Sequence, residues 1–173
     1  MQTTKQELSS YESIFFNKVK VYLDTQLYFY GSIQRDDYFK GKSDIDVDIF
    51  TDNEQSTIFK LQTLLNIEKC KFKKTIWRSF KNNYLIHGHK LMYKEPDNNL
   101  RVEFSIYDEK YKYEMIQEHN RKSHIPYYAS IILIIIKILF YNLNIISKKN
   151  YRVFKKQILS TMIGLPSDDF ITI

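Results

Sequence analysis

The chain has 173 residues, the length of one domain, and its 43% hydrophobic and 27% charged content excludes an intrinsically disordered protein. Its single cysteine, Cys70, excludes a disulfide framework and a cysteine-based zinc cluster. No secretory leader precedes the first expected helix, so we expect a cytoplasmic protein. The net charge of +6 favours polyanionic partners, and nucleic acid is one candidate.

The first half of the chain alternates between expected helices and strands. Apolar residues at helical spacing predict a helix over residues 5–24, and a short apolar strand over residues 27–30 follows it. A loop then leads to a strand over residues 45–50. Asp52 and Gln55 form an expected capping box for a helix that runs to about Asn66. This alternation indicates an α/β or α+β domain.

The strand over residues 45–50 carries carboxylates at every second position. Side chains of a strand alternate between its faces, so Asp44, Asp46 and Asp48 share one face and apolar residues occupy the other. Like charges on one face of a strand need neutralising, and a divalent cation with oxygen ligands is the usual partner. The pattern therefore favours a magnesium site, with Asp48 supporting the other two. A hairpin with an acidic solvent face is the alternative.

The loop before this strand has the properties of a phosphate site. Gly31 allows backbone amides to approach a ligand closely, and Ser32 adds a hydroxyl group. Lys42 and Arg35 are weaker candidates for the same phosphates.

Together these residues resemble the signature of the nucleotidyltransferase superfamily, which includes DNA polymerase beta, the poly(A) polymerases and the minimal nucleotidyltransferases. Gly31-Ser32 is followed, after a spacer, by Asp44-Ile45-Asp46, and the tetrapeptide from Ser43 to Asp46 is closest to the minimal enzymes. The resemblance covers about the first third of the chain. It implies an α+β fold, with a mixed sheet of about five strands flanked by helices and a C-terminal helical extension.

The next part of the chain is expected to form three strands, over residues 71–78, 83–93 and 100–107. On the last strand Glu103 lies on the polar face, between Val102 and Phe104. The superfamily places a third carboxylate in this context, although aspartate is usual there. The resemblance thus implies that Glu103 joins Asp44 and Asp46 as catalytic residue and metal ligand. A structural ion pair between Glu103 and Arg101 or a lysine is the alternative.

The last third of the chain is expected to be helical. A polar helix over residues 108–122, with Asp108 as its N-cap, precedes the very apolar segment 127–146 and a final helix over residues 148–163. The segment 127–146 is long enough to cross a bilayer, but polar residues interrupt it, so we expect a buried helix and no membrane. Residues 1–125 form the expected catalytic core, and residues 126–173 a helical extension packed on it as one compact unit.

Lys137 is an isolated cation in this apolar segment and needs a partner. Members of the resembled superfamily often present a basic residue from such helices to the triphosphate, which makes Lys137 a candidate nucleotide-binding residue. The alternative is that its ammonium group reaches the surface.

The resemblance implies an enzyme that transfers a nucleoside monophosphate from a nucleoside triphosphate to a hydroxyl group. Two Mg²⁺ or Mn²⁺ ions on Asp44, Asp46 and Glu103 would support the reaction, with Gly31, Ser32, Lys42 and Lys137 binding the nucleotide. The acceptor is left open between RNA, protein and a small molecule. Two alternatives remain, which are a catalytically silent nucleotide-binding or interaction module of the same fold and a membrane-attached protein.

Overall fold

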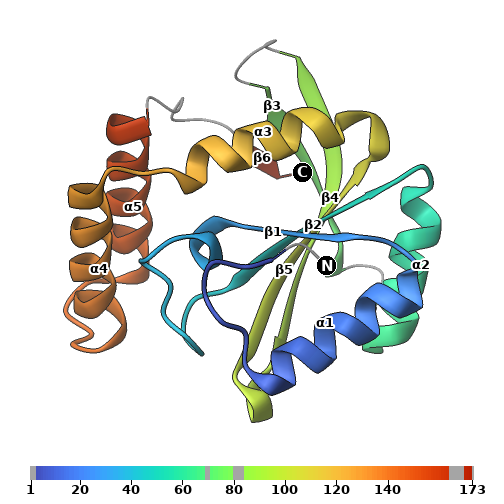
Figure 1. Cartoon of the computed structure of the whole chain (residues 1–173), viewed down its shortest axis with the longest axis horizontal. Coiled ribbons are helices and arrows are strands. Elements are labelled where there is room, and N and C mark those ends of the chain that lie inside the picture. Colours follow the sequence, from blue (N-terminus) through green and yellow to red (C-terminus); the bar gives the residue numbers. More distant parts are fainter. Residues whose placement is uncertain (1–2, 69–70, 80–83, 164–169, 173) are drawn as a thin grey trace.

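The computed structural model describes residues 3–68, 71–79, 84–163 and 170–172. These residues form a six-stranded mixed sheet in the order β1-β2-β5-β4-β3-β6, with helices on both faces (Figure 1). The strands are β1 (Leu27–Tyr30), β2 (Ile45–Thr51), β3 (Lys73–Arg78), β4 (Leu85–Glu95), β5 (Leu100–Asp108) and β6 (Phe170–Thr172). The α+β architecture and five of these strands confirm the expectation from sequence. The short β6, which pairs with β3, is an addition to it.

The helices are α1 (Ser10–Leu23), α2 (Glu54–Leu65), α3 (Lys112–Ser123), α4 (Tyr127–Tyr141) and α5 (Lys148–Ile163). Short 3₁₀ turns, η1 (Gly31–Gln34), η3 (Pro96–Asn98) and η4 (Glu109–Tyr111), connect several elements. Figure 1 shows α1 and α2 on one side of the sheet, α3 running across it, and α4 and α5 side by side.

Helix caps explain where the boundaries differ from expectation. α1 begins at Ser10 because Ser9 and Glu12 form a reciprocal capping box. Asn53 caps α2 in place of Asp52, since its side chain accepts a hydrogen bond from the Ser56 amide at 3.0 Å. Asp108 is a cap as expected, but it caps η4 and the longer helix starts only at Lys112. The sequence also predicts that Gly164 and Pro166 end the last helix, and both lie outside the described residues.

The central strands have different surroundings on their two faces. Ile45, Val47 and Ile49 of β2 join Val102 and Phe104 of β5 in the main core, beneath α1 and α2. On the other face, a smaller cluster of Phe50, Trp77, Ile86, Tyr107 and Met115 lies beneath α3. Asp46 of β2 and Glu103 of β5 also lie on this second face, and they line a cleft together with residues of α4 and α5.

The apolar helix α4 is only half buried. Ala129, Leu133 and Lys137 are buried, whereas Ile131 and Ile135 are among its exposed residues. The helix ends at Tyr141, short of the expected residue 146. Among the described residues no single helix has the length and apolarity to cross a bilayer. One pair of consecutive helical segments meets both criteria when the two are taken together. These are Glu109–Ser123 and Tyr127–Tyr141, which are bent by 83° relative to each other.

Candidate active site

The parallel pairing of β2 and β5 brings two predicted site residues together. Asp46 on β2 is in register with Glu103 on β5, so their side chains share one face of neighbouring strands. Asp44 immediately precedes β2 and lines the same cleft. Within the described residues, no group of three or more acidic, histidine or cysteine side chains is close enough together to hold a metal ion. The structure therefore brings Asp46 and Glu103 together and does not gather Asp44 with them into a cluster of three.

The electrostatics of Asp46 indicate a site for positive charge. Burial raises the pKa of Asp46 to about 7, and the negative charges of Glu103 and Asp44 also raise it, whereas Lys155 and Lys90 lower it. A cation at this position would relieve the repulsion between the carboxylates, and carboxylate oxygens are donors that Mg²⁺ and Mn²⁺ accept. The donor chemistry of this pair therefore fits a divalent ion.

Glu103 already has a cationic neighbour. The Lys90 ammonium on β4 lies 2.6 Å from Glu103 Oε1, and both side chains are partly exposed. Glu103 therefore forms an ion pair with a lysine, one of the two partners that the sequence offered as an alternative to a metal ion. An ion that binds Glu103 has to share it with Lys90 or displace that ammonium.

Gly31 and Ser32 lie directly beside Asp46, at the start of η1. Gly31 has a φ of +74°, and a Cβ atom added to it would lie 2.0 Å from Asp46 Oδ2. Only glycine combines this backbone conformation with so close an approach. Ser32 is buried and lines the cleft that contains Asp46. The turn that contains Gly31 therefore lies directly against the Asp46 carboxylate.

The site opens into a cleft of about 640 Å³ between the sheet and the α4–α5 pair. Its acidic residues are Asp44, Asp46 and Glu103, and cations surround them. The cations that line the cleft are Lys94, Arg101, Lys137, Lys148, Arg152 and Lys155. Three of these come from α5 at positions 148, 152 and 155, a spacing that puts them on one face of the helix. Such a charge distribution suits a ligand with several negative charges that also carries a metal ion.

Lys137 is held by protein groups of its own. Its ammonium lies 3.0 Å from Asp37 Oδ2, donates to the backbone carbonyl of Asp37, and lies 3.3 Å from Ser43 Oγ. Arg35 binds the same carboxylate with two hydrogen bonds, of 2.7 and 3.1 Å. Burial lowers the pKa of Lys137 to about 8 despite the charge of Asp37. Lys137 borders the cleft, but its direct partners are the loop residues that precede Asp44.

Lys42 also binds protein groups. Its Nζ atom lies 2.5 Å from Asn142 Oδ1 and 3.4 Å from the Tyr141 carbonyl oxygen, at the C-terminal end of α4. This arrangement ties the loop to α4, and the structure puts Lys42 outside the lining of the cleft.

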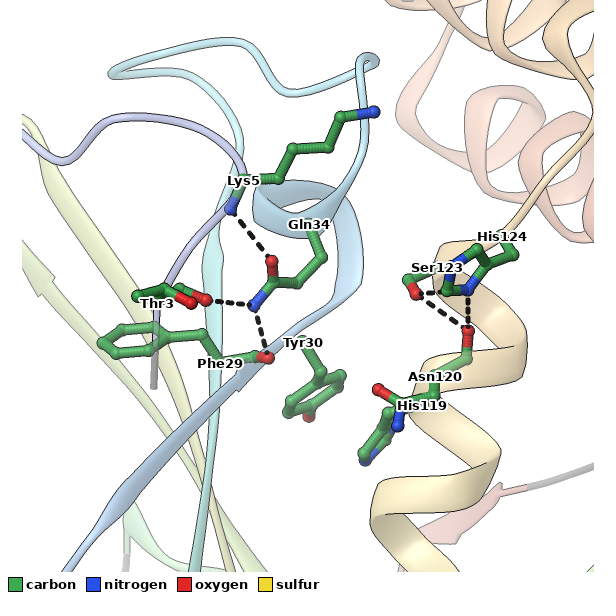
Figure 2. Close-up of a pocket in the computed structure, with 9 residues that line it drawn as sticks. All are labelled: Thr3, Lys5, Phe29, Tyr30, Gln34, His119, Asn120, Ser123 and His124. Atoms are coloured by element: carbon green, nitrogen blue, oxygen red, sulfur yellow. Dashed lines mark hydrogen bonds between the residues drawn. The ribbon is translucent and has the colours of Figure 1, made fainter. Parts of the chain in front are cut away.

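Asp48 has a partner that the sequence did not suggest. It is fully buried, and the His119 Nε2 atom on α3 lies 2.6 Å from its Oδ2. The ring of His119 stacks on Tyr30 with 4.0 Å between centroids, and Tyr30 Oη lies 3.1 Å from Ser105 Oγ. Figure 2 shows Tyr30 and His119 facing each other in a second cavity of about 370 Å³, between β1, η1 and α3. No spacing in the sequence connects residues 48 and 119, so only the fold reveals this pair.

Comparison with known proteins agrees with the fold and the motifs. The sequence model of a family described as nucleotidyltransferase domain matches residues 12–155, which is most of the chain. The chain therefore belongs to this nucleotidyltransferase domain family, and the resemblance inferred from its motifs is confirmed. Nucleotidyl transfer from a nucleoside triphosphate is the general activity of such a domain. No curated protein and no solved structure matches the chain.

Proposed function

We propose that this protein transfers a nucleoside monophosphate from a nucleoside triphosphate to a hydroxyl acceptor in the cleft above Asp46. The observation that carries the proposal is the pairing of Asp46 with Glu103, directly beside Gly31-Ser32, in a cleft with cations on its walls. Each of these parts answers one need of phosphoryl transfer, which depends mainly on positioning and charge stabilisation.

The triphosphate has a binding surface at one side of this site. Ser32 and the backbone of η1 offer hydrogen-bond donors, and Arg152 and Lys155 of α5 offer charge to the outer phosphates. Lys155 lines the same cleft as Asp46, and its charge lowers the pKa of that carboxyl group. Lys137 supports this surface indirectly, by fixing the loop through Asp37 and Ser43.

The acidic residues hold the metal and orient the acceptor. Asp44 and Asp46 are the proposed ligands of Mg²⁺ or Mn²⁺, and Glu103 either joins them or accepts the proton of the acceptor hydroxyl. When bound, one or two such ions supply charge neutralisation of the triphosphate and lower the pKa of the acceptor hydroxyl. The acceptor oxygen forms a bond to the α-phosphorus, the bond to the β-phosphate oxygen breaks, and pyrophosphate leaves.

The test follows label from triphosphates labelled at the α-phosphorus into RNA, protein and small-molecule acceptors, together with pyrophosphate release. The wild-type protein is expected to transfer label only with Mg²⁺ or Mn²⁺, and the double variant Asp44→Asn/Asp46→Asn is expected to transfer none. Asp52→Asn, which removes an exposed carboxylate just before α2, serves as the control with unchanged transfer. Full activity in the double variant would contradict the assignment of these ligands.

One observation favours a second function. Lys90 already forms an ion pair with Glu103, the third carboxylate of the site. A catalytically silent nucleotide-binding module would not need this carboxylate for a metal ion or for proton transfer. Such a module would bind Mg²⁺ and nucleoside triphosphate, with loss of binding in the double variant, but it would release no pyrophosphate with any acceptor.

A further inference from the structure

Two cations face each other directly at the edge of the cleft. Lys94 on β4 is the cross-strand partner of Arg101 on β5, and both side chains line the cleft. Like charges in directly opposed positions of a sheet destabilise it unless a counter-charge is present. In the part of the chain that the structure describes, neither side chain forms an ion pair with a carboxylate. This pair therefore has the electrostatics of an anion site.

Arg101 also contacts the loop that precedes Asp44. Its Nη1 atom donates a hydrogen bond of 3.4 Å to the carbonyl oxygen of Lys42, in the loop that leads to Asp44. A guanidinium group has five N–H donors, so the others remain for a ligand, and their planar arrangement matches a phosphate group. Lys94 adds a second positive charge beside it.

The position of the pair relates it to the acceptor. Arg101 and Glu103 are two residues apart on the same face of β5, which separates their Cα atoms by about 6–7 Å. The cations assigned to the triphosphate come from a different element, α5. The cleft thus carries one set of cations for the triphosphate and another beside the carboxylate assigned to the acceptor.

We propose that Lys94 and Arg101 form a phosphate subsite for the acceptor, and that the acceptor is the 3′-hydroxyl end of a nucleic acid strand. This inference rests on the function proposed above. A terminal nucleotide carries a phosphate and a hydroxyl on one sugar, so the two groups can reach Arg101 and Glu103 together. A protein hydroxyl has no phosphate on the same residue, so a protein acceptor would need a separate acidic side chain to face the cationic pair.

The test compares the double variant Lys94→Gln/Arg101→Gln with the charge-matched control Lys18→Gln/Lys60→Gln, whose lysines lie on α1 and α2, over the other face of the sheet. Binding of a fluorescent single-stranded oligoribonucleotide is measured by anisotropy over a series of salt concentrations. The double variant is expected to bind about tenfold more weakly, with a salt slope reduced by about 0.7 for each cation lost. The control keeps the wild-type affinity.

Binding of the Mg²⁺ complex of a nonhydrolysable triphosphate separates this inference from the proposed function. The double variant is expected to bind it like the wild type, and in transfer assays only the KM for the oligonucleotide rises. Unchanged oligonucleotide binding in the double variant, or equal losses in variant and control, would overturn the acceptor subsite alone. Transfer of the nucleotide to a protein acceptor at the same rate in the wild type and the double variant would also overturn the acceptor subsite. Oligonucleotide binding through the pair without any binding of the triphosphate would overturn the proposed function.

Discussion

Lys137 on α4 forms a buried ion pair with Asp37, 100 residues earlier in the chain, with 3.0 Å between Nζ and Oδ2. Both side chains are essentially inaccessible to solvent, and Arg35 completes the arrangement with two hydrogen bonds to Asp37. The contact joins α4, and with it the α5 cations, to the loop that precedes Asp44. Its integrity should therefore matter both for stability and for the shape of the cleft.

Replacing Asp37 with Asn is expected to destabilise the protein by about 3–5 kcal/mol, because it leaves two buried cations without a counter-charge. The neighbouring Asp36 provides a matched control. It forms an exposed ion pair with Lys5 at 2.8 Å, so Asp36→Asn should cost less than about 1 kcal/mol. Chemical denaturation of both variants measures the difference, and equal losses would contradict the importance of the buried pair.

Lys137 should make stability depend on pH in the alkaline range. Its pKa falls from 10.5 to about 8 on folding, so between these values the unfolded chain binds more protons than the folded one. The free energy of unfolding that Lys137 contributes should therefore rise from pH 8 to pH 10.5. Lys137→Met lacks this term, and the tyrosines that titrate in both proteins cancel in the comparison. The free energy of unfolding of the wild type minus that of the variant, measured in urea, should increase with pH. A constant difference would contradict this.

The strand faces were predictable from sequence because the alternation in β2 and β5 is strict. The same periodicity placed Asp46 and Glu103 on one face of the sheet. It could not supply the register between strands, which puts Lys90 of β4 opposite Ser105 and so within reach of Glu103. His119 was missed for a related reason, since helix α3 meets Asp48 only through the packing of α3 on the sheet.

Boundaries were harder to predict where neighbouring residues compete for one role. Asp52 and Asn53 can both cap a helix, and in the structure Asn53 is the N-cap residue of α2. The three residues of β6 carry too little periodicity for a prediction, and they form a strand only because β3 offers them an edge.

Gly31→Ala should disturb the site more than Gly41→Ala, although both glycines have a positive φ, of 74° and 72°. Each substitution costs about 1–2 kcal/mol in backbone strain. At Gly31 the new Cβ atom would also lie 2.0 Å from Asp46 Oδ2, whereas at Gly41 its nearest neighbour is Asn99 Cβ at 3.8 Å. We expect Gly31→Ala alone to weaken Mn²⁺ and nucleotide binding, which calorimetry measures. Similar binding by the two variants would show that Gly31 is not needed for its closeness to Asp46.

His119→Leu should destabilise the fold because it removes the hydrogen bond to a fully buried carboxylate. Asp48 Oδ2 accepts from His119, and the other oxygen, Oδ1, has no hydrogen-bond partner among the described residues, so the variant would leave a buried acceptor unpaired at a cost of about 1–3 kcal/mol. His119→Gln loses the same stacking on Tyr30 but keeps an N–H donor, so it should recover part of the loss. His124→Leu, at an exposed histidine of the same cavity, should have little effect. Thermal unfolding of the three variants gives the order, and equal midpoints for Leu and Gln at position 119 would show that the hydrogen bond contributes nothing.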